Sequence, residues 1–164
     1  MKRFTAAILI FSFVLILCGC SSQRNVTEPV SFYYCTSPVD YNSPEGVISA
    51  EVRDKCDCGD DLLTLLNSYI LGPETDDFSS PFPAGTRVLS VTVNDSTAEI
   101  CLNDVFTALS GHTLTVASIC ICKTVMDVTG CNTFHIQTQN QELDIEMSGE
   151  DFIFLDDYTL QIQQ

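Results

Sequence analysis

The chain has 164 residues, of which 22 are acidic and 7 are basic, so its formal net charge is −15 at pH 7. A chain this acidic lacks the clusters of Lys and Arg that neutralise nucleic-acid phosphates, which argues against nucleic acid as a partner. The residues that follow position 19 are numerous enough for one domain with a sizeable buried core.

The first 19 residues are typical of a secretory signal peptide. Two basic residues, Lys2 and Arg3, precede a mostly apolar run over residues 4–19. This run is shorter than the roughly 20 apolar residues that a helix needs to cross a bilayer. We therefore expect the segment to direct export rather than to span the membrane.

The end of this segment, Leu17-Cys18-Gly19-Cys20, resembles a bacterial lipobox, with Leu at −3, Gly at −1 and Cys at the cleavage point. The resemblance implies that residues 1–19 are removed and that the Cys20 thiol receives a diacylglycerol group. Acyl chains such as palmitate would then anchor the chain on the outer, extracytoplasmic side of the bacterial cell membrane, each buried methylene contributing about 0.8 kcal/mol. The alternative is an ordinary cleaved signal whose two cysteines have no role.

Hydrophobic periodicity and turn residues predict the elements that follow. In chain order they are a polar tether over 20–29, strands over 30–36 and 47–55, a helix between Asp60 and Gly72, a loop over 74–86, strands over 87–93 and 97–102, a helix over 113–129 closed by Gly130, a strand over 133–138, and a further strand with Leu143, Ile145 and Met147 on one side. Alternation at Tyr158, Leu160 and Ile162 predicts an edge strand in the C-terminal extension, residues 151–164.

The first predicted helix has an expected cap and an expected buried face. Asp57 or Asp60 can cap its N-terminus, because Asp side chains accept hydrogen bonds from the first helical N–H groups. Spacings of three and four place a set of apolar side chains together on one face. They are Leu62, Leu63, Leu66, Tyr69 and Ile70.

This order predicts an α+β fold over residues 30–150. Its core is helix, strand, strand, helix, strand (αββαβ), with both helices packed on one face of a small, mainly antiparallel sheet. A hairpin followed by a right-handed crossover is expected to place the last strand, 133–138, antiparallel beside the first, 87–93. The strands over 30–36 and 47–55 form an N-terminal β-hairpin, and the C-terminal strands lie at the edges.

The face of this sheet that points away from the helices is the predicted interaction face. Side chains alternate along a strand, so the polar positions of three strands share it. The candidates are Ser90, Thr92, Glu99, Cys101, His135 and Gln137. A partner protein, a peptidoglycan fragment or another small envelope ligand could bind there, or the N-terminal hairpin or solvent could simply cover it. Protein assembly is favoured, because sugar sites usually present exposed aromatic rings and the chain has no Trp.

No catalytic residue, cofactor or metal site is predicted. A cysteine nucleophile needs a base within hydrogen-bond reach, and the expected strand order separates Cys101 from His135 by about 10 Å, two strand spacings. The two C-x-C pairs, Cys56/Cys58 and Cys120/Cys122, lack the two- to four-residue spacing usual for zinc ligands. We expect Cys120 and Cys122 to serve as small apolar core residues. Seven cysteines follow Cys20, and the sequence does not decide their redox state.

Residues 69–106, YILGPETDDFSSPFPAGTRVLSVTVNDSTAEICLNDVF, resemble the GerM domain of spore-forming and other bacteria. The shared pattern is a helix ending in L-x-G-P, a loop with S-x-x-P-x-G-T, a hairpin, a long helix and a strand. The resemblance implies a fold like the ring-building motif of secretion and sporulation assemblies. It implies a non-enzymatic assembly or scaffold role in the envelope, in sporulation and germination, with envelope proteins as partners, self-association included. The family commonly has Asp where Cys101 stands, and many members carry a second copy of the domain.

Overall fold

A computed structural model describes residues 27–38 and 47–152 of the chain. The predicted signal peptide, Cys20 and the tail positions Tyr158, Leu160 and Ile162 lie outside the described residues, as does most of the predicted tether.

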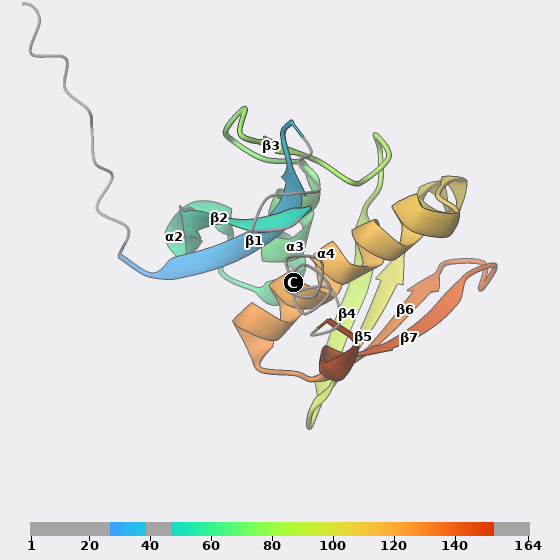
Figure 1. Cartoon of the computed structure of the whole chain (residues 1–164). Coiled ribbons are helices and arrows are strands. Elements are labelled where there is room, and N and C mark those ends of the chain that lie inside the picture. The colour runs from blue at the N-terminus through green and yellow to red at the C-terminus, as the bar shows by residue number, and fades with distance from the viewer. Residues whose placement is uncertain (1–26, 39–46, 153–164) are drawn as a thin grey trace, which may run out of the picture.

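The described residues form an α+β fold with two sheets, as the sequence predicts (Figure 1). The N-terminal sheet has the order β2-β1-β3, and the second sheet has the order β4-β5-β6-β7. The strands are β1 (Pro29–Thr36), β2 (Ile48–Asp54), β3 (Phe78–Ser79), β4 (Val88–Asn94), β5 (Thr97–Leu102), β6 (Thr133–Thr138) and β7 (Asp144–Ser148). The helices are α2 (Lys55–Cys58), α3 (Leu62–Ile70), the 3-10 helix η1 (Asp104–Ala108) and α4 (Gly111–Thr129).

The position of β6 differs from the prediction. It lies beside β5 and parallel to it, with Ala98 opposite Phe134 and Ile100 opposite Ile136. The expected place beside β4 was wrong. A strand–helix–strand crossover through α4 returns the chain in its original direction, so β6 runs parallel to β5. The buried side chains of β5 and β6 therefore lie opposite one another in the middle of the sheet. β7 pairs antiparallel with β6 and forms the edge of the sheet.

The long helix α4 crosses the molecule between the two sheets (Figure 1). Its buried residues cover most of its circumference rather than one stripe, and include Ala117, Cys120, Ile121 and Val125. A helix that is apolar on most sides is expected where both sides are covered by protein. Gly130 ends it in the left-handed conformation, φ 75°, which confirms the predicted stop.

The N-cap of helix α3 is Asp61, one residue after Asp60 and four residues after Asp57, the two predicted caps. The Asp61 carboxylate accepts from the Thr64 N–H at 2.9 Å. The buried face also differs from the prediction, because Leu65 is fully buried whereas Leu63 is exposed. Leu66, Tyr69 and Ile70 are buried as predicted.

Two further boundaries differ from the prediction. The chain leaves the β2 strand at Asp54, whose side chain accepts from the Cys56 N–H and starts the short helix α2. The predicted loop over 74–86 contains β3, which pairs with Cys35 and Thr36 of β1. A two-residue strand has too little sequence for a period to show.

Strand β2 is polar inside and apolar outside. Glu51 and Arg53 are buried, 6% and 8% exposed, whereas Val52 between them is 57% exposed. The Arg53 Nε donates to Glu51 Oε2 at 2.7 Å, and its guanidinium also donates to the Gly72 carbonyl at 2.7 Å. The other Glu51 oxygen accepts from the backbone N–H groups of the chain just beyond α3. The buried ion pair therefore joins β2 to the turn after α3.

Tyrosines fasten the same sheet to α3. Tyr34 Oη donates to the Tyr69 carbonyl at 2.6 Å, and Tyr69 Oη donates to the Tyr33 carbonyl at 2.7 Å. The Arg53 guanidinium lies over the Phe32 ring, 4.9 Å from its centroid. Burial raises the pKa of Tyr69 well above its ordinary value, so this hydroxyl keeps its proton and remains a donor.

Replacing Arg53 with Met is expected to lower the free energy of unfolding by about 3–5 kcal/mol, because Glu51 would stay buried without its cation. Urea unfolding followed by circular dichroism measures the loss. Combining Arg53→Met with Glu51→Gln should recover part of it, since the neutral amide can still accept from the turn. Lys55→Met is the control, because Lys55 pairs with Glu28 in an exposed position. A loss below about 1 kcal/mol for Arg53→Met contradicts the structural role of the pair.

Candidate interaction surfaces

The six predicted interaction-face residues lie together on the four-stranded sheet. They form two rows across β4, β5 and β6 in the observed register. The first row is Ser90, Cys101 and Gln137, and the second is Thr92, Glu99 and His135. Side chains directly opposite one another on adjacent strands lie close enough to interact. Ser90, Thr92, Glu99 and Gln137 are exposed, while Cys101 and His135 are half-buried.

Strand β7 extends this face with acidic residues. Asp144 lies opposite Gln137, and Glu146 lies opposite His135. Glu146 Oε1 is 4.0 Å from His135 Nε2, and Thr92 Oγ1 is 3.4 Å from Glu99 Oε2. The face is therefore a polar surface that carries three carboxylates, Glu99, Asp144 and Glu146, within the described part of the chain.

The relation between Cys101 and His135 differs from the prediction. The predicted separation by two strand spacings was wrong, because β5 and β6 are adjacent. The register pairs His135 with Glu99 and Cys101 with Gln137, so the thiol and the imidazole are diagonal neighbours. The Cys101 thiol donates weakly to the Leu102 carbonyl, at 3.9 Å. The arrangement gives the thiol a backbone acceptor rather than a base.

A bulge interrupts β4 at Leu89. Val88 pairs with Leu102 and Ser90 pairs with Cys101, which leaves Leu89 as the extra residue. Leu89 is 41% exposed, so it does not share a buried face with Val91 as simple alternation predicts. The bulge turns an apolar side chain outward at the edge of the sheet.

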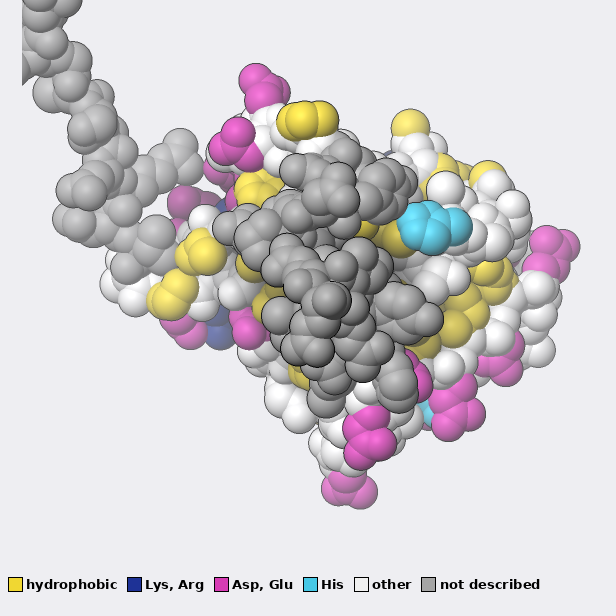
Figure 2. All heavy atoms as spheres, viewed as in Figure 1, with side chains coloured by type: hydrophobic (Ala, Val, Ile, Leu, Met, Phe, Trp, Pro, Cys, Tyr) yellow, Lys and Arg dark blue, Asp and Glu magenta, His cyan; other side chains and the backbone are white. Residues whose placement is uncertain are grey.

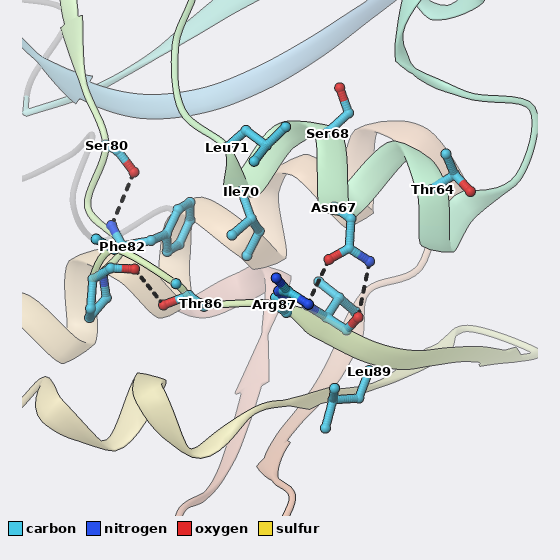
Figure 3. Close-up of a pocket in the computed structure, with 14 residues that line it drawn as sticks. Thr64, Asn67, Ser68, Ile70, Leu71, Ser80, Phe82, Thr86, Arg87 and Leu89 are labelled. Carbon is cyan, nitrogen blue, oxygen red and sulfur yellow. Dashed lines mark hydrogen bonds between the residues drawn. The ribbon is translucent and has the colours of Figure 1, made fainter.

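Asn67 of α3 occupies the edge of β4 (Figure 3). Its side-chain oxygen accepts from the Val88 N–H at 3.1 Å, and its side-chain nitrogen donates to the Val88 carbonyl at 3.0 Å. One amide side chain thus makes the two bonds that a neighbouring strand would make, which blunts this end of the edge.

A groove of about 1060 Å³ runs beside this contact, between α3, the 80–87 loop and β4 (Figure 3). Its apolar lining includes Leu71, which is 90% exposed, together with Leu89 and Phe82. Arg87 also lines it. None of the ion pairs between described residues involves Arg87.

A tight turn shapes the loop side of this groove. The Thr86 N–H and hydroxyl both donate to the Pro83 carbonyl, at 3.1 and 2.8 Å. Gly85 has φ 90°, which a residue with a side chain rarely adopts. Asn103 donates to the Gly85 carbonyl at 2.9 Å and accepts from the Arg87 N–H, so the loop is fixed to the end of β5.

The visible face of the molecule is mainly acidic at its rim (Figure 2). Asp and Glu side chains project around the outline, and Lys and Arg are sparse. Such a surface attracts cationic partners and repels anionic ones.

The model of one protein family matches the chain over residues 32–144, more than half of its length. That family, Germane, is described as sporulation and spore germination. The chain belongs to the Germane family. This confirms the GerM resemblance drawn from residues 69–106. No curated protein is significantly similar to the chain.

Solved GerM structures share the fold of this Germane domain. The first GerMN domain of the sporulation protein GerM from Bacillus subtilis matches with a TM-score of 0.52 and 15% identity, covering 71% of this chain and 86% of that one. The tandem GerMN domains of the same protein match with a TM-score of 0.52 and 14% identity, covering 76% of this chain and 44% of that one. At these identities the likeness shows the fold alone.

The family pattern in the sequence builds the groove. The helix end before Gly72-Pro73 supplies Leu71, and the P-x-G-T segment is the turn over residues 83–86. In the sequence these residues indicate the end of a helix and a turn, and no pattern predicts the groove that they form. No sequence pattern indicated that Asn67 contacts a strand, because Asn is common on helix surfaces. Glu51 and Arg53 did show a pattern that indicates an ion pair, since opposite charges at positions i and i+2 share one face of a strand.

Among the described residues, no helix is both long and apolar enough to cross a membrane. No cluster of three or more His, Cys, Asp or Glu side chains there is arranged to hold a metal ion.

Replacing Asn67 with Ala is expected to expose the Val88 backbone at the edge of β4. Amide hydrogen exchange at Val88 should become at least about tenfold faster, corresponding to roughly 1.4 kcal/mol of lost protection. Ser68→Ala, one residue further along the same helix, is the control. Unchanged exchange at Val88 in Asn67→Ala would show that the side chain does not substitute for a strand.

Proposed function

We propose that this Germane-family chain is a non-enzymatic envelope lipoprotein whose domain acts as a protein–protein assembly module in sporulation or germination. The observation that carries the proposal is the exposed polar face of the four-stranded sheet, on which the six candidate residues form two continuous rows. An exposed polar sheet face of this kind suits a protein partner better than a small molecule, which usually binds in a concave site.

The edge of the sheet favours the same partner class. β4 lies at the edge of its sheet, and Asn67 covers it only at Val88. Val93, further along the strand, is 42% exposed. An antiparallel edge with apolar side chains is a template for a strand from another chain. One partner could therefore contact the face and also add a strand to the sheet beside β4.

The chemistry of the face argues against an enzyme. His135 faces carboxylates across both of its neighbouring strands, and the Cys101 thiol faces the Gln137 amide. Neither pairing supplies a nucleophile with an adjacent base. The two histidines lie on different elements, His112 at the start of α4 and His135 within β6.

The lipid anchor is proposed from the lipobox at Cys20. A diacylglycerol on this thiol would hold the acidic domain at the outer surface of the membrane, where anionic head groups would otherwise repel it. The residues between Cys20 and β1 would act as the tether.

Adding a positive charge to the face is expected to weaken partner binding. Thr92→Arg, in the middle of the second row, should reduce co-purification of the partner after in-cell crosslinking by at least about tenfold, because it adds a bulky cation to a packed contact. Asp127→Arg, exposed on α4, is the control and should leave co-purification unchanged. Equal losses in both variants would mean that charge alone, and not this face, controls binding.

Replacing Cys20 with Ala is expected to abolish both lipidation and cleavage at the lipobox, because the variant has no thiol at the cleavage point. Mass spectrometry should find residues 1–19 still attached and no lipid in the variant, and should show a lipid on an N-terminal Cys20 in the unaltered protein. Cys18→Ala is the matched control and should be lipidated and cleaved normally. An unmodified mature N-terminus in the unaltered protein contradicts the anchor.

The groove supports a second candidate, the binding of a peptidoglycan fragment. Arg87 offers a cation for a stem-peptide carboxylate, and Phe82 and Leu71 offer apolar contact. Saturable binding of purified muropeptides that Arg87→Gln weakens while Thr92→Arg leaves it unchanged would favour this candidate over assembly. Lys123→Gln, on α4, is the charge-matched control.

A further inference from the structure

Two cysteines from distant parts of the chain meet at the contact between β1 and α4. Cys35 lies near the end of β1 and Cys120 lies in the middle of α4. Their side chains lie close enough for each thiol to affect the acidity of the other. In the structure all seven described cysteines are free thiols.

A neighbouring hydrogen bond fixes the register that brings them together. The Tyr33 N–H donates to Thr124 Oγ1 at 3.0 Å. Two residues along a strand advance about 6.6 Å, and four residues along a helix advance about 6.0 Å. Cys35 also lines a cavity together with Val116, one helical turn from Cys120, so the step from Tyr33 to Cys35 runs alongside the step from Thr124 to Cys120. Helix α4 and β1 are in contact.

The two thiols differ in access. Cys120 is fully buried, whereas Cys35 is half-buried and lines a cavity of about 300 Å³. His112 and Val116 line the same cavity, and each lies one helical turn from the next on the side of α4 that carries Cys120. A small reagent can thus approach Cys35 from the cavity, whereas Cys120 does not line the cavity.

The thiols also differ in acidity. The hydrogen bond from the Cys120 thiol lowers the pKa of Cys35, because it stabilises the Cys35 thiolate. The same bond, together with burial, raises the pKa of Cys120 well above its ordinary value. Because Cys35 is reached from the cavity and Cys120 is fully buried, Cys35 is the attacking sulfur and Cys120 the resolving one, and the direction of the pKa shifts agrees with this order.

We propose that Cys35 and Cys120 are a redox pair that closes to a disulfide between β1 and α4. The oxidant is a thiol disulfide such as oxidised glutathione. The Cys35 thiolate attacks one of its sulfurs, and the first thiol leaves and takes a proton. Cys120 then loses its proton and attacks Cys35 Sγ, which forms the Cys35–Cys120 bond and releases the second thiol. Two protein thiols are oxidised by two electrons and one external disulfide is reduced to two thiols.

The other described cysteines are poorer candidates. Cys56 is exposed, but the charge of Asp54 raises the pKa of its thiol. Burial raises the pKa of Cys122, which lies two residues from Cys120 on a different side of α4. The Cys35–Cys120 pair alone combines an accessible thiolate with a second thiol in contact, among the residues that the structure describes.

Closing this bond would clamp the N-terminal sheet to the central helix. It would enclose the whole segment from β1 to α4, including α3 and the groove, in one covalent loop. Long loops lose much chain entropy on crosslinking, so the thermal midpoint should rise by about 10 °C. The inference does not rest on the proposed assembly function, because it concerns a bond within one chain.

The test uses the full chain, purified in detergent and fully reduced, then equilibrated in a glutathione buffer of increasing oxidised fraction. Free thiols are alkylated with one reagent, the sample is reduced, and the released thiols are alkylated with a second reagent for peptide mass spectrometry. We expect Cys35 and Cys120 to acquire the second label together, and a non-reduced digest to contain their linked peptides. Cys122 and Cys131 should keep the first label.

Variants separate the pair from general oxidation. Cys35→Ser should abolish labelling of Cys120 and the rise in the thermal midpoint, whereas Cys122→Ser should preserve both. The unaltered protein decides the outcome even if a variant fails to fold. First-reagent labelling of both Cys35 and Cys120 in fully oxidised glutathione overturns the proposal, as does a linked peptide joining either cysteine to a different one.

Discussion

The buried ion pair of Glu51 and Arg53 is the contact on which the rest of the domain depends. It puts two charges where β2 would otherwise bury apolar side chains, and it satisfies them with the turn after α3 and with the Tyr34 hydroxyl. A buried pair of this kind contributes more to specificity of arrangement than to net stability. Here it fixes where α3 ends. The position of α3 in turn places Asn67 at β4 and opens the groove beside it.

The second organising feature is the crossover through α4. Because this helix returns the chain parallel to β5, β6 enters the middle of the sheet and β4 stays at the edge. The buried side chains of β5 and β6 then face the core. The residues that alternate with them along both strands belong to the two polar rows on the open face. The same helix meets β1 on its other side, so one element links the open sheet, the N-terminal sheet and the Cys35–Cys120 contact.

The sequence predicted the fold class, both main helices and the grouping of the six polar residues, because those depend on local period and on strong stop signals. It did not predict the strand order. The crossover through α4 makes β6 parallel to β5 and antiparallel to β4, so β6 could pair with either strand. Only the matching of buried side chains places it beside β5. The outward position of Leu89 could not be predicted, because a bulge breaks alternation without a sequence signature. The groove and the role of Asn67 depend on how α3 packs against β4, which no local pattern encodes. The Cys120 thiol was expected to be a plain core residue, and its contact with Cys35 arises from the same kind of long-range packing.

We propose that the open face of the four-stranded sheet binds an envelope protein, and site-specific photo-crosslinking in sporulating cells can test this binding. The photoreactive residue is placed at Thr92 on the face, at Leu71 in the groove and at Asp127 on α4. We expect one defined protein adduct from Thr92 and none from Asp127. Adducts from Leu71 alone, or no protein adduct from Thr92, would show that the partner does not bind through this face.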